Sequence, residues 1–108
     1  MRKENRKYYR VKTVKDAKSI ALNYTKDIEV ENVTKFGLPE IDDRFDIWRV
    51  PILALDWTKI GEVVIDALTT FVDNSKTTTK EILENRLLGR PTSKREKRNS
   101  NQDTPKIS

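Results

Sequence analysis

The sequence predicts a small α+β domain: an antiparallel β-sheet of three to four strands, packed against an N-terminal helix and followed by a short C-terminal helix. Apolar residues recur at three- and four-residue steps near the start of the chain and again, more briefly, after its middle, as they do along one face of a helix. Between these two segments apolar and polar residues alternate, as they do in half-buried strands. The 108 residues are enough for one domain.

The first helix is predicted over residues 13–27. Thr13 and Asp16 have the spacing of a capping box, in which a hydroxyl and a carboxylate satisfy the first free N–H groups of a helix. One apolar face is formed by Val14, Ala17, Ile20, Ala21 and Tyr24. We expect this face to pack against the sheet.

Three segments are predicted to form the sheet: residues 29–36, 46–55 and 60–67, with a short continuation at 71–72. The second is the clearest, because one of its faces carries Trp48, Val50, Ile52 and Ala54. Pro51 lies on the other face and cannot donate to a ladder, which predicts an edge strand or a bulge there. The segment FGLPEIDDRF (36–45) has the Gly, Pro and acidic composition of a turn.

A second helix is predicted over residues 78–88. Thr78 and Glu81 repeat the capping-box spacing, and Gly89 followed by Pro91 is a strong stop signal. The chain therefore divides into a basic N-terminal segment (1–12), a single α+β domain (13–89) and a disordered basic tail (90–108).

Part of this domain resembles the PepSY family. Those domains have an amphipathic helix and a small antiparallel sheet whose last strand ends in a valine-rich run, an Asp, two variable residues, Thr-Gly and an apolar residue. The matching positions are Val63, Val64, Ile65, Asp66, Thr69 and Phe71, with Thr70 in place of the usual Gly. IWRVPI (47–52) is similar to the preceding strand, and DAKSIALNY (16–24) to the helix.

The resemblance covers about residues 13–73 and leaves the helix at 78–88 as an addition. It implies the same fold, and a binding or inhibitory module without catalytic residues.

The composition argues against catalysis. The chain has no cysteine and no histidine, which excludes thiolate nucleophiles, disulfides, imidazole chemistry and zinc sites built from these residues. Its three isolated glycines form no phosphate-binding loop. We expect no enzymatic activity, no small-molecule substrate and no cofactor. The basic N-terminus is not followed by an apolar run, so the expected location is a prokaryotic cytoplasm, without a membrane partner.

Two polar groups could be sites or turns. Four carboxylates could hold a divalent cation, or could form a solvated acidic turn: Glu40, Asp42, Asp43 and Asp46. Asp66 and Thr69 could contact a ligand, but their side chains are also the kind that accept backbone N–H groups in a turn. In both cases the structural role is the better prediction.

The leading functional hypothesis is a small non-enzymatic protein-interaction module that associates with itself, and a protein partner or a second copy is the expected ligand. A sheet this small leaves one face half covered, and Ile47, Leu53 and Val64 lie on the face opposite Trp48. Trp57, in the turn between two strands, is the best candidate for an exposed aromatic residue in the same surface.

The charge distribution supports an alternative. Residues 1–18 carry a net charge of +6, residues 19–85 carry −6 and residues 86–108 carry +5. An acidic body with basic ends could bind nucleic acid through those ends, as an accessory protein. The candidate contacts are Arg90, Lys94, Arg95, Lys97 and Arg98.

Overall fold

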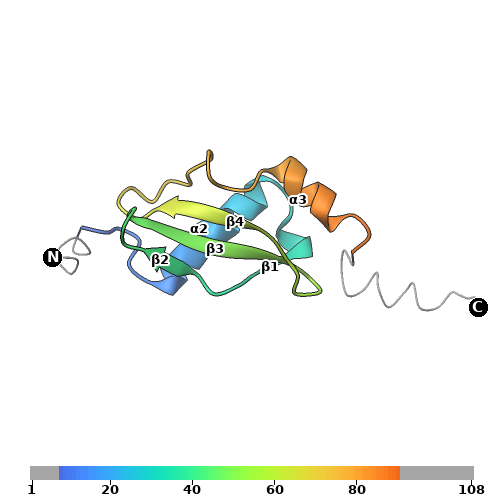
Figure 1. The fold of residues 1–108 in the computed structure, drawn as a ribbon, viewed down its shortest axis with the longest axis horizontal. Helices are drawn as coiled ribbons and strands as arrows, with labels where there is room; N and C mark the ends of the chain where they lie inside the picture. The colour runs from blue at the N-terminus through green and yellow to red at the C-terminus, as the bar shows by residue number, and fades with distance from the viewer. Residues whose placement is uncertain (1–7, 91–108) are drawn as a thin grey trace, which may run out of the picture.

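The computed structural model describes residues 8–90, which form an α+β fold: a helix, a four-stranded antiparallel sheet and a short second helix (Figure 1). The predicted fold class is confirmed. Helix α2 (Val14–Asp27) begins at the predicted capping box. Thr13 Oγ1 accepts the N–H of Asp16 at 3.0 Å, and the Asp16 carboxylate accepts the N–H of Thr13 at 3.2 Å.

The sheet is built around one central strand, β3 (Ile47–Ala54). Strand β4 (Lys59–Asp66) pairs along one side of it. On the other side, β1 (Thr34–Phe36) pairs with residues 52–54 and β2 (Glu40–Asp42) pairs with residues 47–49. The second edge of the sheet is therefore shared by two short strands in succession (Figure 1).

Two predictions about this second edge were wrong. The predicted strand at 29–36 begins only at Thr34, because Glu29 adopts a left-handed φ of 65° and Glu31–Val33 form a short 3₁₀ turn, η1. The predicted turn at 36–45 contains β2, whose three residues gain strand conformation from pairing with β3.

Pro51 lies in the central strand and not at an edge; of the two predicted alternatives, an irregularity is present one residue further on, where the register of β3 against β4 shifts between Ile52 and Leu53. The carbonyl of Pro51 accepts the N–H of Gly37 at 2.9 Å, which places its missing N–H on the same side, toward the gap between β1 and β2. The ladder is already interrupted at this gap, so the proline removes no bond that a neighbouring strand needs.

The core lies between the sheet and α2. Trp48, Val50, Ile52 and Ala54 of β3 are all buried on this inner face, as the alternation predicts. Ala17 and Ala21 of α2 pack against them with no exposed surface, and their small size lets the helix approach the sheet closely. Trp48 Nε1 donates to the carbonyl of Val11 at 2.8 Å and so fixes the chain that leads into the helix.

Residues 71–79 and helix α3 (Lys80–Leu87) cover the free edge of β4 (Figure 1). Three backbone N–H groups bond across this edge: Asp66 to Phe71 O at 2.8 Å, Asp73 to Val64 O at 2.7 Å and Thr78 to Glu62 O at 3.0 Å. Leu83 of α3 is fully buried near Gly61 of β4. The predicted continuation at 71–72 is a single bridge between Val72 and Ile65.

Candidate functional site

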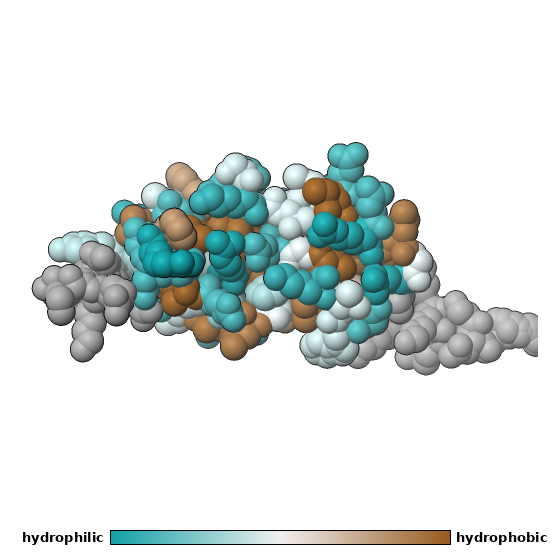
Figure 2. Space-filling view, in the orientation of Figure 1, coloured by the Kyte–Doolittle hydropathy of each residue, from teal (hydrophilic) through white to brown (hydrophobic). Residues whose placement is uncertain are grey.

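The outer face of the sheet, opposite α2, is not an open apolar surface. Figure 2 looks onto this face and shows hydrophilic residues across much of it. Ile47 is 5% exposed and Val64 is fully buried, which corrects the expectation that both lie on an uncovered face. Leu53 is half-buried, and Trp57 is exposed as expected.

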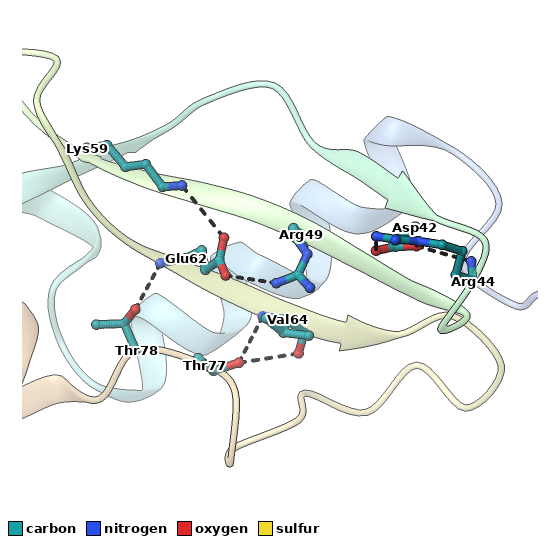
Figure 3. Close-up of polar contacts among 8 residues, drawn as sticks. All are labelled: Asp42, Arg44, Arg49, Lys59, Glu62, Val64, Thr77 and Thr78. Carbon is teal, nitrogen blue, oxygen red and sulfur yellow. Dashed lines mark hydrogen bonds and ion pairs between the residues drawn. The ribbon is translucent and has the colours of Figure 1, made fainter.

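The cover over Val64 comes from the segment between β4 and α3. Thr77, itself buried, places its Oγ1 2.8 Å from the backbone nitrogen of Val64, whose N–H it accepts. Thr78 Oγ1 accepts the N–H of Glu62 at 3.0 Å (Figure 3). Two threonine hydroxyls thus satisfy the backbone of β4 and hold this segment along its edge.

The centre of the outer face carries ion pairs. Glu62 pairs with Arg49 at 3.1 Å and with Lys59 at 3.7 Å (Figure 3). These side chains are partly exposed, so each pair contributes little to stability. Their effect is to keep the centre of this face polar, which makes it a poor surface for an apolar partner.

The acidic turn is held by partners within the protein. Asp42 accepts hydrogen bonds from the Arg44 side chain at 3.0 and 3.1 Å, and these bonds hold the pKa of Asp42 below its ordinary value. Asp46 accepts the hydroxyl of Tyr9 at 2.7 Å. Glu40 lies exposed on β2, and Asp43 follows that strand. Within residues 8–90 no group of three or more acidic residues is arranged to hold a metal ion.

Asp66 and Thr69 close the corner after β4. Asp66 Oδ1 accepts the N–H groups of Leu68 at 2.8 Å and Thr69 at 3.1 Å, and Thr69 Oγ1 accepts that of Phe71 at 3.3 Å. Thr70 adopts the left-handed φ of 75° that glycine favours. Both side chains are therefore used in building the turn.

Of the five candidate nucleic-acid contacts, only Arg90 lies within the described residues. It donates to Asp56 Oδ2 at 2.6 Å and to Thr58 Oγ1 at 3.2 Å, in the turn between β3 and β4. Its charge is thus paired inside the domain. Lys94, Arg95, Lys97 and Arg98 lie outside the described residues, so the nucleic-acid alternative stays a prediction.

An apolar groove lies between one flank of α2 and strand β1. Its volume is about 620 Å³, and it is lined by Val14, Lys15, Lys18, Ser19, Leu22 and Phe36. Leu22 is 40% exposed and Val14 is 37% exposed, while Phe36 is half-buried against the core. Sequence reasoning missed this groove, although Leu22 carried a signal: it is an apolar residue outside the predicted buried stripe of the helix.

The groove runs beside an open edge of the sheet. The N–H of Gly37 donates to Pro51 O, and hydrogen-bonded pairs alternate along an antiparallel ladder, so Lys35 also directs its backbone toward β3. Thr34 and Phe36 then direct theirs away from β3. Among residues 8–90, β1 has no strand partner on that outer side. The edge therefore offers two N–H and two C=O groups.

Three lysines lie beside the groove and this edge. Lys15 and Lys18 are exposed at the rim of the groove, and the residues that line it include no acidic side chain. Lys35, on the outer face of β1, holds its Nζ 3.8 Å from the centre of the Trp57 ring, a cation–π contact. The groove and the edge thus differ in charge from the acidic segment at β2.

Comparisons with models of protein families, with curated proteins and with solved structures found no match to this chain. The resemblance to PepSY domains stays a prediction. None of the helices in residues 8–90 is long and apolar enough to cross a membrane.

Proposed function

We propose that the protein is a non-enzymatic protein-interaction module and that the groove between α2 and β1 is its binding surface. The observation that carries this proposal is the incomplete burial of Leu22 and Val14 beside Phe36. Leu83 on α3 is buried completely, and the outer face of the sheet is closed by threonines and ion pairs. A groove lined by apolar side chains that the domain leaves partly exposed is a surface suited to a partner.

The occupant is a segment of another protein that brings apolar side chains and negative charge. Apolar side chains fill the groove, and acidic ones pair with Lys15 and Lys18 at its rim. A second copy docked groove to groove would bring four of these lysines together, and like charges at an interface disfavour association. Charge therefore favours a different chain over self-association.

The residues in the chain fit this role better than catalysis. The described residues include no group of three or more acidic side chains placed to hold a metal ion, and the chain has no histidine or cysteine. The resemblance to PepSY domains, which act as binding or inhibitory modules, supports the same proposal.

A peptide library displayed on phage tests the proposal without an assumed partner. We expect the wild-type protein to enrich peptides whose binding is lost in the Leu22→Glu variant. The matched control is Ile82→Glu on α3, because Ile82 has the same exposure, 41%, but lies outside the groove. Both substitutions are on exposed helix surfaces, and circular dichroism checks that each variant is folded.

Two results contradict the proposal. One is the absence of any enriched sequence. The other is a set of enriched peptides that bind the Leu22→Glu variant as well as they bind the wild-type protein, which would place the binding surface elsewhere.

A further inference from the structure

Resting on the proposed function, we infer that the partner segment binds in extended form, as an additional strand on the free edge of β1. Apolar side chains of this segment alternate with acidic ones. The apolar residues enter the groove under α2, and the acidic residues lie beside Lys35 on the outer face and beside Lys15 and Lys18 at the rim.

The backbone geometry of β1 supports the addition of a strand at its free edge. Thr34 and Phe36 direct their N–H and C=O groups to the open edge, as the bond from Gly37 to Pro51 requires. An unpaired edge is a template for another strand, and several peptide-binding domains use it in this way. A helix lying in the same groove would leave these four backbone groups without partners.

The alternation of side chains along a strand supports a motif of alternating apolar and acidic residues. Phe36 stands opposite Ile52, so its side chain lies on the inner face, toward α2. Every second side chain of an added strand lies on that face too, in the space lined by Phe36 and Leu22. The side chains between them lie on the outer face, where Lys35 is the neighbouring residue of β1. An apolar–acidic–apolar order therefore matches both faces.

The length of the edge limits the motif. Strand β1 has three residues, and after it Pro39 has no N–H to offer. Beyond that point β2 carries Glu40 and Asp42, which repel an acidic segment. The recognised motif is therefore short and centred on the two outward-facing residues of β1. The C-terminal residues 91–108 of this chain carry a net positive charge and so do not fit the lysine rim.

The probe is a short fluorescein-labelled peptide in which valine and glutamate alternate, measured by fluorescence anisotropy on the full chain. We expect it to bind at least about tenfold more tightly than a peptide in which valine and lysine alternate. The double variant Lys15→Glu/Lys18→Glu should reverse this preference. The matched control, Lys76→Glu/Lys80→Glu, makes the same charge change on the segment beside β4 and should leave the preference in place.

Backbone methylation tests the strand itself. An added strand uses the N–H groups of every second residue only, in either direction. We therefore prepare one peptide with N-methyl groups on its valines and one with N-methyl groups on its glutamates. One of the two should lose binding by at least about tenfold and the other should keep it. In addition, saturating peptide should slow the hydrogen exchange of the Thr34 and Phe36 amides, with little change at Lys35, whose N–H already bonds to β3.

The outcomes separate this inference from the proposed function. If peptides bind through Leu22 but both methylated forms behave alike and the Thr34 and Phe36 amides exchange at unchanged rates, strand addition is wrong and the interaction module stands. If the valine–lysine peptide binds as well as the valine–glutamate peptide, the acidic motif is wrong. If no peptide binds in a way that depends on Leu22, the proposed function itself fails.

Discussion

The hydroxyl of Thr77 bonds to both backbone polar groups of Val64. Its oxygen accepts the N–H at 2.8 Å and its O–H donates to the carbonyl at 3.3 Å, and both residues are buried. At this point of β4 a side chain bonds to the two backbone groups that a neighbouring strand would otherwise satisfy. One edge of the sheet is closed in this way, while the other edge, at β1, stays open. The contrast between the two edges is the structural basis of the proposed binding surface.

Replacing Thr77 by valine should destabilise the protein by about 1–3 kcal/mol, because it leaves the buried N–H of Val64 without an acceptor. The carbonyl of Val64 keeps the N–H of Asp73 at 2.7 Å, so the cost comes mainly from the N–H. Urea denaturation followed by circular dichroism measures the free energy of unfolding. Thr77→Ser keeps the hydroxyl and is the control, with an expected loss of less than half that of Thr77→Val. Equal stability of the valine variant and the wild-type protein would show that the hydroxyl is not required.

Gly61 lies where β4, residues 71–79 and α3 come closest. A Cβ at this position would lie 2.7 Å from Thr78 Oγ1, 2.8 Å from Thr78 Cβ and 2.9 Å from Leu83 Cδ2, all shorter than van der Waals contact. Thr78 cannot move away without losing its bond to the N–H of Glu62. Gly61→Ala should therefore destabilise the protein by about 1–3 kcal/mol.

The measurement for Gly61→Ala is again the free energy of unfolding in urea. A second variant, Leu83→Ala, separates the two neighbours of the added methyl group. If the clash with Leu83 dominates, the double variant Gly61→Ala/Leu83→Ala loses less stability than the two single variants lose together. A Gly61→Ala protein as stable as the wild type would mean that α3 does not pack against β4 as the structure has it.

Replacing each of two neighbouring threonines in the turn after β4 by glycine should change the stability of the protein in opposite directions. Thr70 has a φ of 75°, which costs a β-branched residue about 1–2 kcal/mol and costs glycine almost nothing. Glycine also has more conformational freedom in the unfolded chain, and this offsets part of the relieved strain. Thr70→Gly should therefore stabilise the protein by about 0.5–1 kcal/mol. Thr69→Gly should destabilise it, because Thr69 Oγ1 accepts the N–H of Phe71. Thermal unfolding of the two variants side by side measures both signs, and a stability loss in Thr70→Gly contradicts the reasoning.

The elements with strong local signals were predictable. Helix α2 follows from its capping box and apolar stripe, and β3 from the alternation around Trp48. Helix α3 was placed within two residues at its start, where the cap is Thr79 and not Thr78. Thr78 instead gives its hydroxyl to the N–H of Glu62. The position of the corner at Asp66 also followed from its residue types.

What could not be predicted depends on contacts between distant parts of the chain. Strand β2 exists because β3 pairs with it, and no pattern in Glu40–Asp42 indicates this. Val64 was expected on an open face because nothing local shows that Thr77 would cover it. The groove needs Leu22 and Phe36 side by side, and only the packing of α2 on the sheet brings them together.

Protonation of the Asp56 carboxylate in acid should lower the stability of the β3–β4 turn. The backbone N–H of Thr58 bonds to its carboxylate at 3.1 Å and, with the Thr58 hydroxyl and the Arg90 guanidinium, holds the pKa of Asp56 below its ordinary value of 3.8. A carboxyl whose pKa is lower in the folded state stabilises the fold fully above its ordinary pKa. That contribution is lost as the pH falls through the lowered value.

The Asp56→Asn variant has no carboxyl to protonate, so its stability should decline less between about pH 5 and about pH 2 than that of the wild-type protein. Urea unfolding across this range measures the difference between the two proteins, which should be largest at the higher pH and shrink in acid. Arg90→Gln, which leaves Thr58 in place, should reduce the wild-type pH dependence only in part. A difference between the wild-type protein and Asp56→Asn that stays constant across the range would show that the Asp56 carboxyl has the same pKa in the folded and unfolded chains.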